Sequence, residues 1–161
     1  MMRSENNTYS TKFKKLTELK KFIGKEVGLT DWMQMSQQKI NDFAKITDDE
    51  QWIHTDPEKS ALYSPYKKTI AHGFLVLSMV SRISFDAFSI QNVVAGINYG
   101  LDRVRFPNAT KSDSIYRGRV SLMEFTEIPG GAKYKLKVKI EIKGEDKPAC
   151  IAEFIALAYT K

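Results

Sequence analysis

Two short segments of the sequence place groups capable of acid–base chemistry beside strongly apolar stretches. In the first segment, Asp49 and His54 lie five residues apart in a stretch without helical periodicity, so both side chains can turn into one cleft. A carboxylate and an imidazole that share a water molecule are the groups that general acid–base catalysis requires. An acidic helix end beside a surface histidine would give the same spacing, so the pattern alone leaves both interpretations open.

The second segment begins a helix that the sequence predicts from Ala71 to Phe88, apolar on nearly all sides over its first three turns. Gly73 falls in the first turn, where backbone amides have no partner within the helix and the helix dipole favours negative charge. Without a Cβ atom, Gly73 would let a carbonyl oxygen approach its amide, as in an oxyanion hole. Tight packing of the helix start is the alternative explanation. For His72 we expect a structural hydrogen-bonding role.

The composition limits the class of protein. The chain has 161 residues, of which 42% are apolar, and a formal charge of +6, which favours a single globular domain. The single cysteine, Cys150, permits no internal disulfide and fits a reducing compartment, and the first residues lack the apolar core of a signal peptide. The longest apolar run is too short to cross a bilayer. We therefore expect a cytoplasmic protein without a membrane partner.

Charge and motifs narrow the choice of ligand. The positive charge permits an anionic partner, but the lysines are spread over several expected elements, which argues against nucleic-acid binding. The two histidines and Cys150 show no spacing typical of a zinc site, so we expect no metal. The sequence contains no dinucleotide-binding, P-loop or GxSxG motif, which disfavours nucleotide-dependent and serine-hydrolase chemistry. We expect no cofactor.

Helices are expected in the first half of the chain. Apolar residues recur every three positions over Phe13–Phe22, which we interpret as part of an amphipathic helix over residues 11–24. A second helix is expected over residues 36–47, with Ser36 as its N-cap. The stretch 48–68 lacks a clean period and is expected to be irregular, with one short turn of helix near residues 57–62.

Strands are expected in the second half. Apolar residues and charged residues, mostly lysines, alternate over residues 134–143, which predicts a half-exposed strand. A further strand is expected over residues 113–126, and the run 149–159 is apolar on both faces, which predicts a central strand covered on two sides. Over residues 97–106 the apolar positions change from odd to even, which requires a bulge or turn near Asp102.

This order of elements predicts one α+β domain spanning residues 1–161, an antiparallel sheet packed against the long apolar helix. Residues 1–10 are polar and are expected to form a frayed tail. A sheet that wraps around a single helix leaves an edge strand uncovered. We therefore expect a homodimer that continues the sheet.

The residues singled out above carry a resemblance. The pattern Asp49-x-x-x-Ile53-His54, followed by Ser60 and by Ile70 to Leu75, resembles the hydratase-2 signature of MaoC-like (R)-specific enoyl-CoA hydratases and dehydratases. Residues 51–54, 70–75 and 98–107 are similar to the nodulation protein N branch of that family. The resemblance covers about residues 16–159 and implies a hot-dog fold, in which the sheet wraps around a long helix.

The resemblance also implies an activity, the hydration of a trans-2-enoyl-CoA thioester or the reverse dehydration of a 3-hydroxyacyl thioester. Its implied catalytic groups are Asp49, His54 and the amide of Gly73, and the partner is an acyl-CoA or acyl-carrier thioester, with coenzyme A entering as part of the substrate. The expected substrate-binding residues, polar groups near the site or along the path of the coenzyme A handle, are Gln51, Ser81, Lys67, Lys68, Arg103 and Arg105.

The sequence departs from the general signature at several positions. Asp48 stands where the signature has a glycine, Gln51-Trp52 where it has Asn-Pro, and Tyr66-Lys67-Lys68 where the commoner sequence is Phe-Gly-Gly. These departures leave two other functions open, a non-catalytic acyl-CoA or acyl-carrier binding protein and a hot-dog thioesterase.

Overall fold

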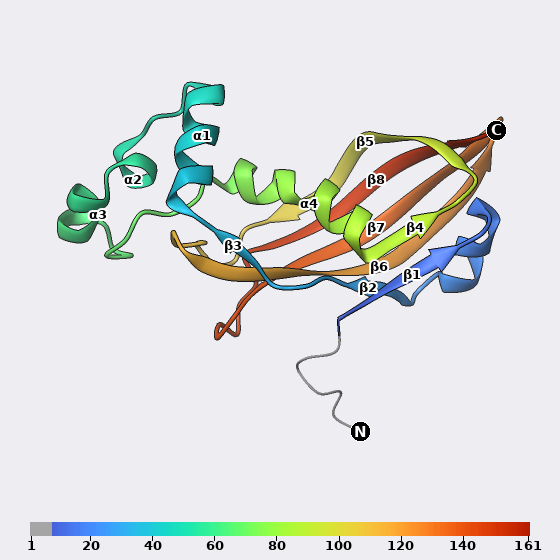
Figure 1. Cartoon of the computed structure of the whole chain (residues 1–161), viewed down its shortest axis with the longest axis horizontal. Helices are drawn as coiled ribbons and strands as arrows, with labels where there is room; N and C mark the ends of the chain where they lie inside the picture. The colour runs from blue at the N-terminus through green and yellow to red at the C-terminus, as the bar shows by residue number, and fades with distance from the viewer. Residues whose placement is uncertain (1–7) are drawn as a thin grey trace.

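A curved sheet wraps around one long apolar helix, α4, in the computed structural model of the chain, which describes residues 8–161 (Figure 1). The sheet order is β4-β1-β2-β6-β7-β8-β5, and β3 pairs with β6 beside this path. The elements, in chain order, are β1 (Tyr9–Phe13), the 3₁₀ helix η1 (Leu16–Phe22), β2 (Glu26–Leu29), β3 (Met33–Met35), α1 (Gln37–Thr47), α2 (Trp52–Thr55), α3 (Pro57–Tyr63), α4 (Gly73–Ala87), β4 (Phe88–Ile90), β5 (Val93–Arg105), β6 (Ser114–Ile128), β7 (Gly131–Ile142) and β8 (Cys150–Thr160).

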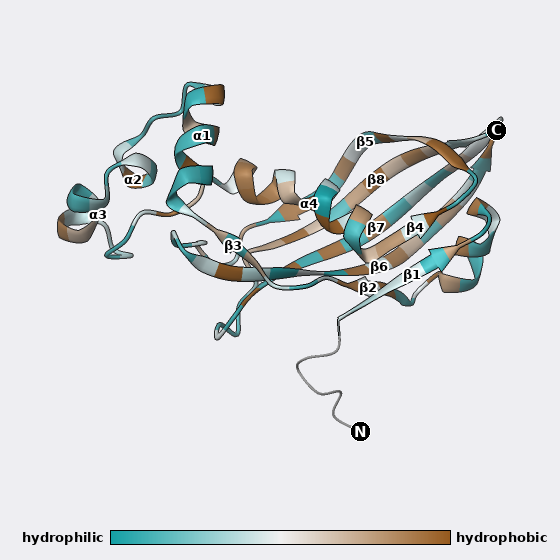
Figure 2. Cartoon of the chain, viewed as in Figure 1, coloured by the Kyte–Doolittle hydropathy of each residue, from teal (hydrophilic) through white to brown (hydrophobic). Residues whose placement is uncertain are grey.

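The α+β prediction is confirmed, but the sheet is mixed and not purely antiparallel. Its long strands β5 to β8 pair antiparallel, whereas β1 and β4 pair in parallel. The parallel pair arises because β4 continues directly from the end of α4 and lies along β1. Along β7 the apolar side chains point to α4 and the lysines point away, and the strand is banded accordingly in Figure 2.

Helix α4 lies close to the sheet because two glycines leave room for it. A Cβ atom added at Gly118 would lie 2.1 Å from Cγ2 of Ile83, and one added at Gly28 would lie 2.1 Å from the carbonyl oxygen of Ala87. Ile83 and Ala87 are fully buried at this contact. The predicted long buried helix is confirmed, and this close contact fixes its position on the concave face of the sheet.

The N-terminal part of the prediction is wrong in its secondary structure. The expected helix over residues 11–24 is instead the end of β1 followed by η1. The three-residue recurrence of apolar side chains matches the period of a 3₁₀ helix, and Phe13 is buried from a strand. Of the expected tail 1–10, Tyr9 and Ser10 lie in β1, paired with β2, and residues 1–7 lie outside the described part of the chain.

Most of the remaining predicted elements are confirmed with small changes. The exception is the stretch 48–68, where the structure has α2 as well as the expected helical turn, which is α3. Ser36 caps α1 by accepting a hydrogen bond from the amide of Lys39, at 3.3 Å. The register of β5 against β8 shifts between Leu101 and Val104, where the bulge was expected. Strand β8 lies between β7 and β5 as predicted, but only one of its faces is buried, because α4 covers the concave face alone.

Helices α1 to α3 form a lobe beside the sheet, at the end where α4 begins (Figure 1). The sheet ends at β5, a 13-residue strand whose side chains are largely exposed. Within residues 8–161, no helix has the length and apolar character needed to cross a membrane.

Candidate active site

The end of helix α1 places Asp49 at the edge of the lobe. The helix ends at Thr47, and Asp48 then takes the left-handed conformation with φ of 55°. The amide of Asp49 donates to the carbonyl oxygen of Ala44 at 3.1 Å, which closes the end of the helix. Glycine, asparagine and aspartate adopt this backbone conformation most readily, so Asp48 can occupy the position of the signature glycine.

Helix α2 presents His54 from the opposite side. The Nδ1 atom of His54 lies 2.7 Å from the carbonyl oxygen of Ile70, and the amide of Ile70 donates to the carbonyl oxygen of Ile53 at 3.1 Å. These two bonds attach α2 to the chain segment that leads into α4. A carbonyl oxygen only accepts, so Nδ1 carries the proton, and the Nε2 atom of a neutral ring keeps its lone pair.

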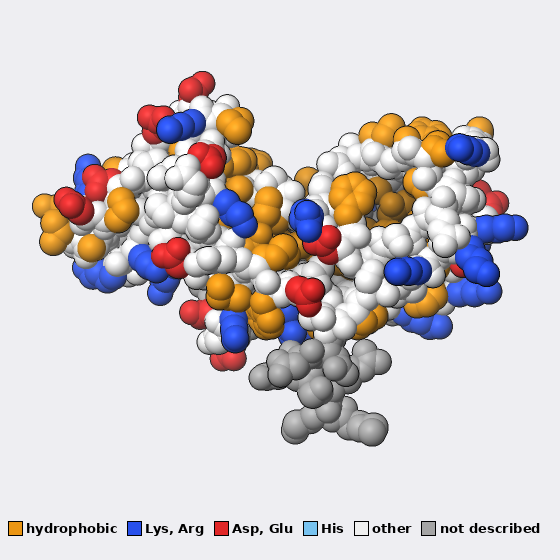
Figure 3. All heavy atoms as spheres, in the orientation of Figure 1, with side chains coloured by type: hydrophobic (Ala, Val, Ile, Leu, Met, Phe, Trp, Pro, Cys, Tyr) orange, Lys and Arg blue, Asp and Glu red, His pale blue; other side chains and the backbone are white. Residues whose placement is uncertain are grey.

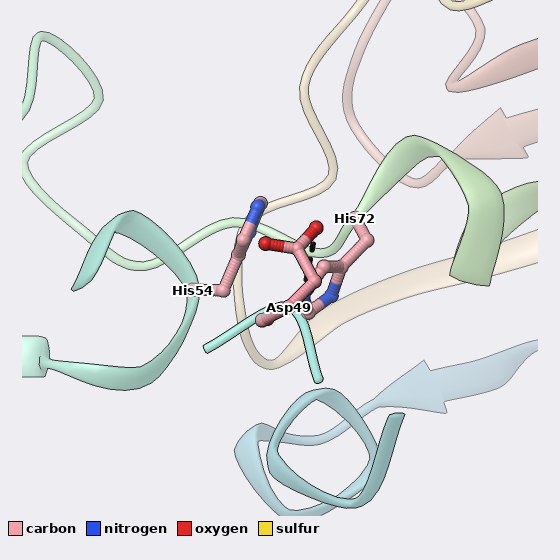
Figure 4. Close-up of side chains that lie close together, drawn as sticks. All are labelled: Asp49, His54 and His72. Carbon is pink, nitrogen blue, oxygen red and sulfur yellow. Dashed lines mark hydrogen bonds and ion pairs between the residues drawn. The ribbon is translucent and has the colours of Figure 1, made fainter. Parts of the chain in front are cut away.

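His72 completes the cluster from the start of α4. Its ring is buried and stacks on the ring of His54, with centroids 3.7 Å apart and planes at 26°. Its Nε2 atom donates to the backbone oxygen of Asp49 at 2.9 Å and lies 3.9 Å from the carboxylate. Figure 4 shows the three side chains converging from the loop after α1, from α2 and from the start of α4. His72 therefore has the hydrogen-bonding role expected of it, and it is also in contact with both candidate catalytic residues.

The electrostatics of the cluster favour a neutral His54. Burial is the main cause that lowers the pKa of His54 below its ordinary value of 6.5, and neighbouring His72 lowers it further, while the Ile70 carbonyl and Asp49 act in the opposite direction. The Asp49 side chain is 56% exposed and remains open to solvent. One nitrogen or oxygen from each of Asp49, His54 and His72 lies within 4.8 Å of those of the other two. Two polar atoms that each lie about 2.8 Å from one water molecule can be this far apart, so the spacing admits a shared water.

Two histidines and a carboxylate at this distance are also a donor set found in metal sites. The geometry does not suit a metal ion, however. His72 uses its Nε2 atom for the Asp49 carbonyl, and the stacked rings hold the lone pairs of both imidazoles in nearly parallel planes, which do not converge on one point. The arrangement suits a shared water better than a shared cation.

Gly73 is the first residue of α4, and the side chain of the N-cap residue, His72, makes no capping hydrogen bond. Its amide is thus one of the four that have no acceptor within the helix. A Cβ atom added at Gly73 would lie 3.1 Å from Cε2 of Phe106. The structure is therefore consistent with both roles considered for Gly73. Its amide has no acceptor within the helix, as an oxyanion donor requires, and its position is closely packed against Phe106. Sequence patterns gave no indication of Phe106 as the neighbour, because the contact joins α4 to the end of β5.

Ser81 lies two turns further along α4 and accepts a hydrogen bond from the side chain of Asn98 on β5, at 3.0 Å. Two hollows of about 240 Å³ and 350 Å³ follow α4 and β5 and share Ser81, Asn98 and Phe154 in their walls. Figure 3 shows apolar side chains gathered in hollows on this face. The hollows continue away from Gly73 along the helix, and their walls do not include Asp49 or His54.

The other expected binding residues are not part of the cluster. Gln51 is exposed just before α2. The Nζ atom of Lys67 donates to the carbonyl oxygen of Leu62 at 3.2 Å, within the same loop region. That of Lys68 donates to the carbonyl oxygen of Ser112 at 2.8 Å and pairs with Asp113, which joins this loop to the start of β6. The remaining two, Arg103 and Arg105, are exposed on β5.

Comparisons with known proteins agree with this architecture. The family model described as MaoC like domain matches residues 18–142. The chain is 38% identical over 144 residues to 3-hydroxyacyl-thioester dehydratase Z of Mycobacterium tuberculosis, covering 89% of this chain and 95% of that protein. It is 40% identical over 145 residues to nodulation protein N of Rhizobium leguminosarum bv. viciae, covering 88% of this chain and 89% of that protein.

Solved structures show the same fold at low sequence identity. An unliganded R-hydratase from Pseudomonas aeruginosa superposes with a TM-score of 0.69 and 17% identity, covering 86% of this chain and 83% of that one. This likeness confirms the predicted hot-dog fold.

Proposed function

The chain belongs to the MaoC-like domain family, as the sequence resemblance predicted, and from this premise we propose that it is an (R)-specific hydratase of trans-2-enoyl thioesters. The reverse reaction, dehydration of a 3-hydroxyacyl thioester, is the one named for the mycobacterial relative. The single observation that carries the proposal is the convergence of Asp49 and His54 beside the start of α4, within the distance that one water molecule spans.

In the proposed reaction, the water donates hydrogen bonds to the Asp49 carboxylate and to Nε2 of His54. The water oxygen adds to the β-carbon of the enoyl group, and His54, which is held neutral, accepts the proton that the water loses. The catalytic pair then returns one proton to the α-carbon. One water is added in total, and both side chains end in the protonation state in which they began.

The Gly73 amide acts on the other end of the conjugated system. As water adds to the β-carbon, negative charge develops on the thioester oxygen, and an unpaired amide at a helix start stabilises such a charge. One donor of this kind typically contributes about 3 kcal/mol to transition-state stabilisation. Because Gly73 follows His72 directly, the donor is fixed relative to the catalytic pair by the main chain.

The hollows between α4 and β5 are the proposed site for the acyl chain. Their walls are mainly apolar, with Leu77, Phe154 and side chains of β5, and the Ser81–Asn98 hydrogen bond satisfies two polar groups there. The exposed Arg103 and Arg105 are the proposed contacts for the anionic handle of coenzyme A or of a carrier-bound phosphopantetheine. Lys67 and Lys68 would have to leave their present loop partners to contribute.

The decisive experiment follows the absorbance of crotonyl-CoA and of longer and branched enoyl thioesters with purified protein. We expect the enoyl absorbance to decrease, and we expect Asp49→Asn to lower kcat by about a hundredfold to ten-thousandfold while the thermal unfolding midpoint stays unchanged. Calorimetric binding without turnover would favour the acyl-binding alternative. Release of free coenzyme A thiol would favour a thioesterase.

We also propose a cytoplasmic homodimer. Strand β5 ends the sheet, and its exposed side chains include Val94, Ile97 and Tyr99. Unpaired backbone groups and apolar side chains on an edge strand favour pairing with a second copy. Sedimentation equilibrium measures the oligomeric state directly, and a monomer at micromolar concentration would contradict this part of the proposal.

A further inference from the structure

We propose that Gln37 is a positioning residue for His54, and that the hydrogen bonds of its side chain fix the imidazole against Asp49. Gln37 is the first residue of α1 and lies seventeen residues before His54. This inference rests on the proposed function for its kinetic consequences, although its structural part can be measured without any substrate.

Both the nitrogen and the oxygen of the Gln37 side-chain amide make hydrogen bonds. Its nitrogen lies 2.7 Å from the backbone oxygen of His54 and 2.9 Å from Oδ1 of Asn41. Its oxygen accepts a short hydrogen bond from the hydroxyl group of Thr69, which is fully buried. An amide has two N–H donors and a carbonyl acceptor, so these three contacts match its capacity. Glutamate lacks the donors, and leucine lacks both functions.

The three contacts connect every segment that carries the catalytic cluster. Gln37 belongs to α1, whose end leads to Asp49, and its nitrogen binds α2 at His54. Thr69 directly precedes Ile70, whose carbonyl oxygen accepts from Nδ1 of His54. The side chain of Gln37 therefore holds the backbone on one side of His54 and, through Thr69, the segment that binds the ring on the other side.

Helix α2 is short and partly exposed, so its position depends on hydrogen bonds such as the one from Gln37 and the one from the amide of Ile70 to the carbonyl oxygen of Ile53. It is four residues long, and each of its residues is only partly buried. A helix of this length is not stable by itself, since helix nucleation is unfavourable. The ring of His54 keeps its place through the Ile70 carbonyl, the stack on His72 and the backbone bond from Gln37.

Loosening α2 should change both the rate and the titration of His54. The groups that face this ring are Asp49 and His72, and burial is the main cause of its lowered pKa. A more mobile α2 exposes the ring to solvent, so the pKa of His54 should rise toward its ordinary value. A misplacement of a catalytic group by about 1 Å is sufficient for a hundredfold loss of rate.

The test compares Gln37→Leu with Gln38→Leu, the neighbouring exposed glutamine, whose side chain bonds only to Asp42 among the described residues. In Gln37→Leu we expect kcat to fall about tenfold to a hundredfold with KM within twofold, and the acid limb of kcat/KM to move to higher pH. Gln38→Leu should match the parent protein. Thr69→Val removes the hydrogen bond to the Gln37 side-chain oxygen, so we expect a smaller loss of kcat and a smaller shift of the acid limb. This variant replaces Gln37→Leu in the test if Gln37→Leu does not fold.

An NMR titration of the His54 ring in the absence of substrate separates this inference from the proposed function. A higher His54 pKa in Gln37→Leu, but not in Gln38→Leu, supports the positioning role even if no thioester is hydrated. An unchanged titration in folded Gln37→Leu and Thr69→Val overturns it. Equal losses of kcat in the Gln37 and Gln38 variants would also overturn it, since both then reflect a general effect on α1.

Discussion

The lobe of helices α1 to α3 and the sheet of this protein are held together by different forces. In the lobe, α2 has no buried residue and α3 has only Ser60, and its segments are joined by hydrogen bonds from Gln37 and His54. In the sheet, the inward side chains of β7 and β8 pack on α4 as a continuous apolar core. Hydrogen bonds are directional and each contributes about 1 kcal/mol net, whereas apolar burial is additive and not directional. The positions of α2 and α3 thus depend mainly on directional hydrogen bonds, and the position of α4 on the sheet depends mainly on apolar packing.

The largest effect is expected at the junction of the two regions. Gly73→Pro removes the proposed oxyanion donor at the first position of α4, where proline is well tolerated, and His72 already has the extended ψ of 139° that suits a residue before proline. We expect kcat to fall about a hundredfold to a thousandfold, with an unchanged far-ultraviolet circular dichroism spectrum.

The matched control is Gly73→Ala, which keeps the amide but adds a Cβ atom 3.1 Å from the Phe106 ring. If Gly73 is needed only for packing against Phe106, Gly73→Ala and Gly73→Pro will lower kcat equally. Combining either variant with Phe106→Leu will then restore kcat.

A large effect on stability is expected in the sheet region. Gly118→Ala places a methyl group against Ile83, at 2.1 Å in the present geometry, and overpacking of this kind typically costs about 1 to 3 kcal/mol. We expect a lower free energy of unfolding in urea, with kcat per folded molecule unchanged.

Gly96→Ala on β5 is the control for Gly118→Ala, since nothing lies within 4 Å of its added Cβ atom. A parallel loss of kcat in Gly118→Ala would show that the two regions are not separable.

A moderate effect is expected from pH. Because burial lowers the pKa of His54, the neutral base persists below the ordinary value of 6.5, and kcat/KM at pH 6.5 should exceed half of its plateau. Activity is then lost as the pH falls through the lowered pKa. The sign is the same for stability, since the unfolded chain takes up this proton at a higher pH than the folded protein. An acid limb centred above pH 6.5 would contradict the burial of His54.

The smallest effect is expected at the end of α1. Asp48 has a φ of 55°, which glycine adopts more easily than aspartate. Glycine also has more freedom in the unfolded chain, which opposes this gain, so we expect Asp48→Gly to raise the free energy of unfolding by a net value of about 0.5 kcal/mol. Asp48→Ala should lower it, because alanine tolerates this conformation less well than aspartate. Thermal unfolding of the two variants measures the contrast, and equal midpoints would show that the conformation is not strained.

Period and capping sufficed to predict the elements with a strong local pattern. Helix α1 follows from Ser36 and its apolar face, α4 from a long apolar run, and β7 from strict alternation. Strands β1 to β3 are three to five residues long, too short to show a period, and they form because they pair with each other or with β6.

The candidate site was only partly accessible from the sequence. The spacing of Asp49 and His54 permitted a shared cleft without requiring it, and the structure brings the two side chains together, with His54 on the short helix α2 and not in the expected non-helical stretch. The contact of His72 with both residues depends on how α4 docks against the lobe. Gln37 resembles any polar residue in the first turn of an amphipathic helix, because its contact to His54 joins two helices that only the folded chain brings together.

The hydrogen bond between Ser81 and Asn98 has a consequence for how this molecule can diversify. It lies in the walls of the hollows along α4, and those walls do not include Asp49, His54 or His72. Under the proposed function, substitutions around it would widen or shorten the space for a hydrocarbon tail without touching the residues proposed for proton transfer. Under the proposed function, a change in the preferred acyl chain length would therefore require substitutions only toward the C-terminal part of α4, while the residues near its N-terminus stay the same.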